Sequence, residues 1–147
     1  MTDQPTTEAD PRLGLTVTHR RYVSYAEAHY AGHLVAGGYV LGLFGDVATE
    51  VCIRTDGDEG LLASYAEVRF LAPVRAGDVL EVSATVVRVG NRSRDLDLAA
   101  QVVARGEPER GESAARVVEP ATVAVTARAT VVVPPNGRPG SAVGFNG

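Results

Sequence analysis

Three polar residues interrupt a mostly apolar stretch between residues 37 and 54. They are Asp46, Thr49 and Glu50, and their spacings of three and four put them on one face if the stretch is a helix. Burial raises the pKa of a carboxyl group, and two carboxylates on one face can divide acid and base roles. We therefore predict that at least one of the two carboxylates transfers protons in a reaction. The alternative is that both reach solvent or pair with arginines such as Arg54.

Glycines at the start of this stretch suggest a second kind of chemistry. Gly37 and Gly38 would lie in the first turn of the helix, where backbone N–H groups have no intrahelical partner. Such N–H groups can hold a carbonyl oxygen that becomes negative during a reaction. The other explanation for glycine is close packing of the helix on a sheet, which we expect to apply to Gly42 or Gly45.

Two histidines, His29 and His33, are four residues apart just before the helix. On a continuous helix they could bind one metal ion. However, Gly32 interrupts the stretch, His19 belongs to a predicted strand, and the sequence has no cluster of Cys and His to supply further ligands. We therefore predict no metal site. A histidine near the helix N-terminus could instead bind a substrate, transfer a proton or simply pack.

Residues 89–94, Val-Gly-Asn-Arg-Ser-Arg, form a predicted turn between two strands. Its arginines are either solvated in an ordinary hairpin or grip a phosphate group. The sequence contains neither a G-x-G-x-x-G motif after a strand nor a phosphate-binding loop, and it suggests no Ser, His and acid triad. Nicotinamide, flavin and nucleoside triphosphate chemistry are therefore disfavoured.

The rest of the chain is predicted to form strands around the helix. Turn residues bound five strand-like segments, which are 13–23, 61–73, 79–89, 96–104 and 122–133. A capping box at Ser24 predicts a short helix, and residues 106–119 are predicted to form a loop. This order predicts an α+β domain in which one antiparallel sheet wraps around a long central helix. Pairing of an edge strand with a second copy would give a homodimer, or a higher assembly of dimers.

Composition sets the class of protein. The 147 residues are 45% hydrophobic and 22% charged, as in one globular domain; we place this domain at 12–134, with flexible tails at 1–11 and 135–147. The net charge of −4 provides no positive field for nucleic acid or an anionic membrane. No apolar run is long enough to span a bilayer. With one cysteine, Cys52, in an apolar run and no secretory signal, we expect a cytoplasmic protein.

Several segments together resemble the β-alanyl-CoA and 3-aminobutyryl-CoA ammonia-lyases, a branch of the hotdog superfamily. The more specific ones are Ala-His-Tyr-Ala-Gly-His-Leu-Val-Ala-Gly at 28–37 and Gly-Asp-Val-Ala-Thr-Glu at 45–50. Phe-Leu-Ala-Pro-Val at 70–74 and Val-Gly-Asn-Arg-Ser at 89–93 also match, but such segments occur in many hotdog proteins. The resemblance spans about residues 13–133 and implies the hotdog fold.

The resemblance also implies a reaction. A short 3-aminoacyl-CoA thioester would enter between two subunits, and the amides of Gly37 and Gly38 would polarise its carbonyl. A carboxylate would remove the α-proton as ammonia leaves, giving an α,β-unsaturated acyl-CoA. Glu50 is the first choice for this base with Asp46 assisting the amine, and the opposite assignment is open. No metal or cofactor beyond the CoA moiety is implied. The remaining implied site residues are His29 in catalysis; Tyr30, His33 and Thr49 at the substrate; and Asn91, Arg92, Ser93 and Arg94 at the CoA phosphates.

Other activities are open on the sequence alone. A hotdog acyl-CoA thioesterase is the first alternative, but related thioesterases place the helix carboxylate eight residues after the glycine. Asp46 is nine residues after Gly37, which turns it by about 100° around the helix. The others are an enoyl-CoA hydratase-like enzyme and an acyl-CoA binding module without turnover. Substrate selection is expected to depend on His33 and Ala36, where the family commonly has asparagine.

Overall fold

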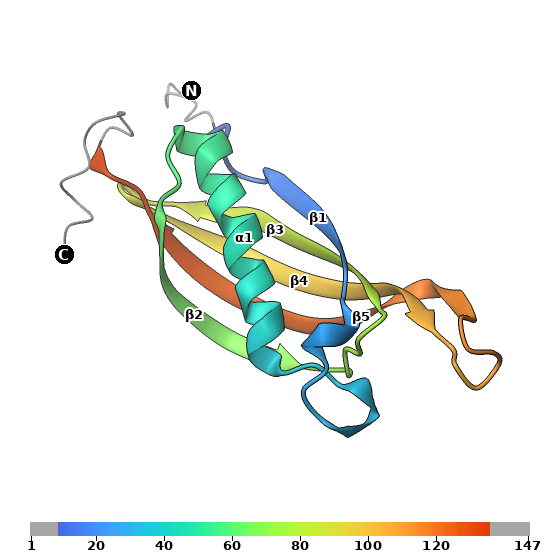
Figure 1. Cartoon of the computed structure of the whole chain (residues 1–147). Coiled ribbons are helices and arrows are strands. Elements are labelled where there is room, and N and C mark those ends of the chain that lie inside the picture. The colour runs from blue at the N-terminus through green and yellow to red at the C-terminus, as the bar shows by residue number, and fades with distance from the viewer. Residues whose placement is uncertain (1–8, 136–147) are drawn as a thin grey trace.

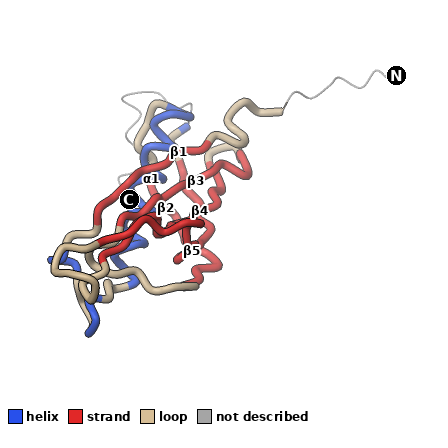
Figure 2. Tube along the Cα trace, turned by 90° about the vertical axis from the view of Figure 1, so that its right-hand side faces the viewer, coloured by secondary structure: helices blue, strands red, loops and turns tan. Residues whose placement is uncertain are grey.

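One long helix, α1 (Gly37–Asp56), lies across one face of a five-stranded sheet in the computed structural model of the chain, which describes residues 9–135 (Figure 1). All strand pairs are antiparallel, and the order across the sheet is β1-β3-β4-β5-β2. The predicted α+β architecture is therefore confirmed. Figure 2 shows the strands from the side as one twisted sheet. The strands are β1 (Thr16–Tyr22), β2 (Leu61–Phe70), β3 (Val79–Val89), β4 (Ser93–Gly106) and β5 (Ala115–Val132).

The apolar side chains of α1 form one buried face. Val40, Phe44, Val47 and Val51, spaced three and four apart, are fully buried against the sheet. The helix ends where Gly57 adopts a left-handed conformation (φ 65°) that closes its last turn by an N–H bond to the carbonyl of Ile53, 2.9 Å.

The opposite face of α1 is open in the single chain. Gly38, Gly42, Asp46 and Ile53 are exposed along it. The sheet therefore covers only the side of α1 that carries Phe44.

Buried and partly exposed residues alternate along the central strands β3 and β4, so one face of the sheet is apolar and packs against the buried face of α1. In β3 the buried residues Leu80, Val82, Ala84 and Val86 point to the same face of the sheet, and the residues between them are partly exposed. In β4, Leu96, Leu98, Ala100 and Val102 are buried in the same way, in register with β3. The core is therefore one layer of mainly aliphatic side chains, with Phe44 among them, between this face and α1.

The predicted loop at 106–119 is wrong in its second half. β5 begins at Ala115 and pairs with the end of β4, so the two strands form a long hairpin that projects beyond the rest of the sheet (Figure 1). This extension pairs Gly106 with Ala115 and Arg105 with Arg116. Sequence periodicity missed it because residues 103–106 are all half-buried and 115–117 are all exposed, so buried and exposed side chains do not alternate there.

Two local elements also differ from their predictions. The helix expected from Ser24 is a single 3₁₀ turn (Tyr25–Glu27), although the Ser24 hydroxyl does accept from the N–H of Ala26, 3.1 Å. A second 3₁₀ turn (Ala31–His33) follows, with Gly32 and His33 in left-handed conformations. These residues therefore form a compact loop before α1.

The sheet leaves β2 as an exposed edge. β2 pairs with β5 and not with its sequence neighbour β3, because the connection at 71–78 runs past the start of α1 and across the end of the sheet. There the N–H of Val35 donates to the carbonyl of Val74, 3.0 Å.

Within residues 9–135, no helix is long and apolar enough to cross a membrane. The predicted tail residues 1–8 and 136–147 lie outside the described part of the chain.

Candidate functional site

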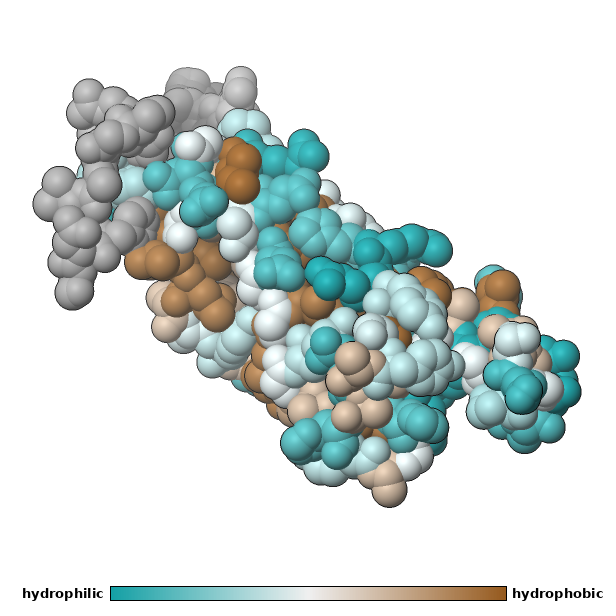
Figure 3. Space-filling model, in the orientation of Figure 1, coloured by the Kyte–Doolittle hydropathy of each residue, from teal (hydrophilic) through white to brown (hydrophobic). Residues whose placement is uncertain are grey.

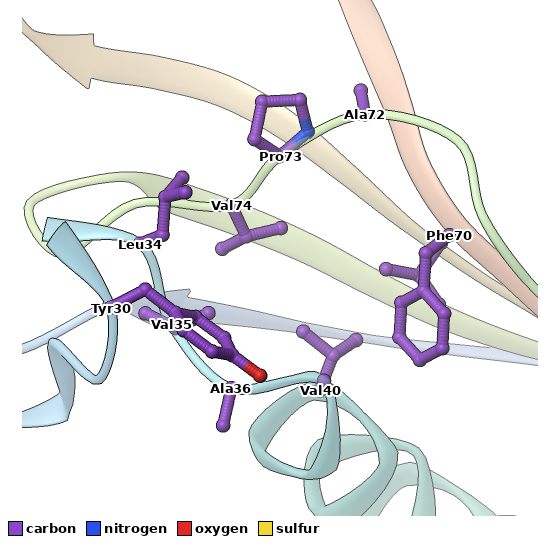
Figure 4. Close-up of a pocket in the computed structure, with 11 residues that line it drawn as sticks. Tyr30, Leu34, Val35, Ala36, Val40, Phe70, Ala72, Pro73 and Val74 are labelled. Atoms are coloured by element: carbon purple, nitrogen blue, oxygen red, sulfur yellow. The ribbon is translucent and has the colours of Figure 1, made fainter. Parts of the chain in front are cut away.

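A pocket of about 360 Å³ opens beside the first turn of α1. It lies between the loop before α1, the end of β2 and the connection from β2 to β3 (Figure 4). Its walls are mainly apolar, which suits an acyl group better than a nucleotide. Side chains that line it include Tyr30, Leu34, Val40, Phe70, Val74 and Val125.

The loop before α1 is held in shape by its own backbone. The N–H groups of His29 and Tyr30 both donate to the carbonyl of Leu34, at 2.8 and 2.9 Å, and Ala28 pairs with Val35 in an isolated β-bridge. This arrangement turns the Tyr30 ring over the pocket, with its hydroxyl directed toward the first turn of α1 (Figure 4). The predicted substrate residue Tyr30 is therefore a wall of the pocket.

The N-terminus of α1 reaches the same pocket without a capping side chain. Ala36, the N-cap residue, is extended, and it and Gly37 line the pocket. The amides of Gly37 and Gly38 lie in the first turn, where an α-helix has no internal acceptor for them. They can bind a carbonyl oxygen, as the sequence predicts.

The space around the glycines of α1 differs from one glycine to the next. A Cβ on Gly37 would lie 2.9 Å from the Phe70 ring, so a larger residue there would push the ring aside. Among the described residues, no atom lies within 4 Å of a Cβ built on Gly38 or Gly42, and Gly45 has only the Tyr65 hydroxyl, at 3.9 Å. The prediction that close packing explains Gly42 or Gly45 is therefore wrong.

The two predicted histidines are directed to different places. His29 stacks edge-on against the Tyr30 ring, with centroids 4.6 Å apart, so it lies next to the pocket. His33 instead lines a separate, more polar cavity of about 530 Å³ with Tyr25 and Arg75. No continuous helix carries both histidines. Within residues 9–135, no group of three His, Cys, Asp or Glu side chains could hold a metal ion.

Asp46, Thr49 and Glu50 form a polar stripe along α1, and the two carboxylates of this stripe are not buried. Asp46 is 60% exposed and lies 3.6 Å from the guanidinium of Arg21. Glu50 is 33% exposed, and its two oxygens accept from His19 Nε2 and Arg54 Nε, each at 2.7 Å. These hydrogen bonds lower the pKa of Glu50. The predicted raised pKa is therefore wrong for Glu50, because its hydrogen bonds favour the charged form more than partial burial disfavours it.

His19 is a partner of this stripe that the sequence analysis did not find. Alternate residues of β1, Val17, His19 and Arg21, face α1, and the last two reach Glu50 and Asp46. The signal for this was the period-two alternation of β1, combined with the four-residue spacing of the acids on α1. Only the packing of β1 against α1 shows that the side chains on these two faces contact each other.

Distance separates the stripe from the pocket within one chain. Asp46 is nine residues and Glu50 thirteen residues beyond Gly37 along α1, which corresponds to about 13 and 20 Å of helix rise. Thr49 is half-buried, and its hydroxyl donates to the carbonyl of Gly45, 2.9 Å. The amides and carboxylates of a single chain therefore do not converge on one reacting group.

The predicted CoA-binding turn lies at the other end of α1. Arg94 is only 3% exposed, and its guanidinium binds Asp56, the last residue of α1, through Nη2 at 2.8 Å and Nε at 3.2 Å. It also donates to the carbonyls of Gly90 and Ser93. Arg94 is therefore unavailable to a phosphate, and its predicted CoA role is wrong because a buried ion pair already uses its donors.

The other three residues predicted to bind CoA in this turn differ in whether their side chains are free to bind a phosphate. The Ser93 hydroxyl accepts from Arg88, 2.9 Å. Asn91 and Arg92 are exposed, and within residues 9–135 the Arg92 guanidinium makes only a long contact of 3.4 Å to the carbonyl of Val133. Of the four predicted residues, Asn91 and Arg92 are thus the ones that face solvent and can meet an anion.

Comparison with known proteins places these features in a family. Residues 32–100 match the family described as the Thioesterase superfamily. The 3-aminobutyryl-CoA ammonia lyase of Acetoanaerobium sticklandii is 46% identical over 112 residues, which cover 76% of this chain and 89% of that protein.

Solved structures give a consistent result. The beta-alanyl-CoA:ammonia lyase from Clostridium propionicum superposes with a TM-score of 0.78 and 32% identity, over 82% of this chain and 86% of that one. A hexameric hotdog fold thioesterase of Campylobacter jejuni superposes with a TM-score of 0.64 and 18% identity, over 84% of this chain and 82% of that one, a likeness of fold alone. The predicted hotdog fold is confirmed.

The buried ion pair leads to a stability prediction. Arg94→Ala leaves Asp56 with Arg12, at 3.0 Å, as its remaining guanidinium partner, so the loss of unfolding free energy should lie near the lower end of the about 3 to 5 kcal/mol that breaking a buried pair costs. Urea unfolding followed by circular dichroism measures this loss. Arg92→Ala, two residues away and exposed, is the matched control, with an expected change below about 0.5 kcal/mol. Equal stability of the two variants would contradict a structural role for Arg94.

Proposed function

The chain belongs to the 3-aminobutyryl-CoA ammonia lyase family, and from this premise we propose that it eliminates ammonia from a short 3-aminoacyl-CoA. The product is an α,β-unsaturated acyl-CoA, and the reverse reaction adds ammonia to it. The observation that carries the proposal is the uncapped N-terminus of α1, where Gly37 lines an apolar pocket and Gly38 follows it in the first turn.

Substrate activation follows from that geometry. The thioester carbonyl oxygen accepts hydrogen bonds from the Gly37 and Gly38 amides, at the positive end of the helix dipole. These bonds strengthen as negative charge develops on the oxygen, which makes the α-carbon more acidic. The acyl chain lies in the apolar pocket beside Tyr30, with His29 behind the Tyr30 ring.

Elimination needs a base and a route for the amine. A carboxylate removes the α-proton, the C–H electron pair forms the new double bond, and the C–N bond breaks as the substrate's protonated amine, –NH3⁺, leaves as ammonia with the C–N electron pair. The contacts favour Asp46 as this base, because its carboxylate is exposed, whereas both oxygens of Glu50 already accept hydrogen bonds. This is the second of the two assignments open on the sequence. Glu50 then has a positioning role through its contacts with His19 and Arg54. Thr49 borders the substrate.

A second copy supplies the carboxylate that one chain cannot bring to its own pocket. Antiparallel pairing of the β2 edge with its copy would reverse the direction of α1, so the middle of one helix approaches the start of the other. Exposed Leu61, Leu62 and Ile53 flank this edge, and apolar side chains gather between α1 and the start of β2 (Figure 3). The homodimer, alone or within a larger assembly, is therefore part of the proposal.

The same reversal would bring the 89–94 turn of the copy toward the pocket. Asn91 and Arg92 would then meet the CoA phosphates, with Ser93 supporting the turn. We propose no cofactor beyond the CoA of the substrate. The buried thiol of Cys52, whose pKa burial raises to about 11, is compatible with the expected reducing, cytoplasmic environment.

The direct test is to mix the purified protein with crotonyl-CoA and ammonium. We expect ammonium-dependent loss of the conjugated thioester absorbance, formation of 3-aminobutyryl-CoA by mass spectrometry, and no free thiol. Release of CoA thiol without ammonium would identify a thioesterase instead. Addition of water in place of ammonia would identify a hydratase.

Paired variants test the assignment of the base. Asp46→Asn removes the proton acceptor while keeping its shape, and it should lower kcat by about a hundredfold or more. Glu50→Gln should retain most of the turnover, because Glu50 is held in contacts with His19 and Arg54. Steady-state kinetics in the amination direction measures both. A larger loss in Glu50→Gln would restore the opposite assignment.

A charge on the β2 edge tests the need for two copies. Leu62→Lys places an ammonium group on the edge where strands would pair, so we expect dissociation to monomers and loss of turnover. Val87→Lys, on β3 and about as exposed (39% against 41%), is the control. Sedimentation velocity gives the assembly state of each. A fully active Leu62→Lys monomer would exclude a shared site.

A further inference from the structure

Phe70 occupies an unusual position at the mouth of the apolar pocket. It is the last residue of β2, where its backbone pairs with Val125 of β5. The next two N–H groups, of Leu71 and Ala72, both donate to the carbonyl of Ala124, at 2.7 and 3.2 Å. The backbone is therefore anchored on β5, yet the residue is 56% exposed although it is a large apolar one.

The Phe70 ring lies directly against the start of α1. A Cβ on Gly37 would meet its Cε1 and Cζ atoms at 2.9 Å, so the ring would have to move if residue 37 carried a side chain. The ring and Tyr30 face each other across the pocket, and Val40 lies beside the ring (Figure 4). Any group that enters with its carbonyl at the Gly37 amide must therefore pass along this ring.

From these contacts we propose that Phe70 is the specificity-determining residue for acyl-chain length. The inference rests on the proposed function, since it assumes a thioester carbonyl at the amides of Gly37 and Gly38. A chain that starts there is limited on one side by the ring of Phe70 and on the other by Tyr30. Short substituents fit between them, whereas longer chains collide with the ring.

The floor of the pocket leaves a longer acyl chain little other room. The floor of the pocket consists of Val40, Val74 and Val125, which are all buried in the core, and a packed core does not yield easily to extra methylenes. In a fixed apolar pocket, one methylene changes discrimination by about 10- to 200-fold. Removing one ring at the mouth should therefore change the accepted chain length and not merely weaken binding.

The test measures binding of saturated acyl-CoAs, which cannot undergo the elimination in either direction. Isothermal titration calorimetry gives Kd for butyryl-, hexanoyl- and octanoyl-CoA with the wild-type protein, Phe70→Ala and Leu71→Ala. Leu71 is the matched control, because it is adjacent, apolar and 59% exposed but does not line the pocket. We expect Phe70→Ala to improve octanoyl-CoA binding relative to butyryl-CoA by about tenfold or more, and Leu71→Ala to leave the ratio unchanged.

Several results would overturn the inference. An unchanged octanoyl to butyryl ratio in Phe70→Ala, an equal shift in Leu71→Ala, or no binding of the series by the wild-type protein would each do so. So would a change of assembly state in sedimentation velocity without a change of ratio, which would make Phe70 an interface residue. If Phe70→Ala does not fold, Phe70→Leu should give a smaller shift in the same direction.

This design separates the inference from the proposed function. A shifted binding ratio in a protein that does not consume crotonyl-CoA with ammonium would support the chain-length role and reject the lyase reaction. Consumption of crotonyl-CoA with ammonium, together with an unchanged octanoyl to butyryl binding ratio, would support the lyase reaction and reject the chain-length role.

Discussion

The packing of α1 on the sheet is the constraint on which the other features depend. Phe44 and the valines around it bury one face of the helix against the alternating side chains of β3 and β4, and burial of apolar surface is the main stabilising contribution in such a domain. Because this face is continuous, both ends of the helix have defined positions. The first turn opens on the apolar pocket, while Asp56 in the last turn is held by Arg94.

Electrostatics along α1 reflects the same packing. Glu50 accepts hydrogen bonds from His19 of β1 and from Arg54 of α1 itself, and these bonds favour its charged form. Asp46 lies 3.6 Å from Arg21 of β1 but stays 60% exposed. Two acids four residues apart on one helix thus differ in their availability to a substrate, because only Glu50 has both oxygens engaged in short hydrogen bonds.

The proposed chemistry divides between two regions that one chain holds apart. The Gly37 and Gly38 amides lie at the start of α1, and the carboxylates lie about 13 to 20 Å further along it. An exposed edge strand and an open helix face provide the surface on which a second copy could join these regions. Assembly and catalysis are then consequences of one feature, a small sheet that covers one side of a long helix.

The sequence by itself determined the long helix α1, the alternating strands and their α+β arrangement. Its resemblance to hotdog proteins also pointed to Tyr30 and Gly37, which line the pocket. Tertiary structure alone decided the partners of the charged groups. Neither the burial of Arg94 nor the contact of His19 with Glu50 has a local signal, because each joins elements more than thirty residues apart. An ion pair of this kind depends on which faces meet, and a linear pattern does not encode that.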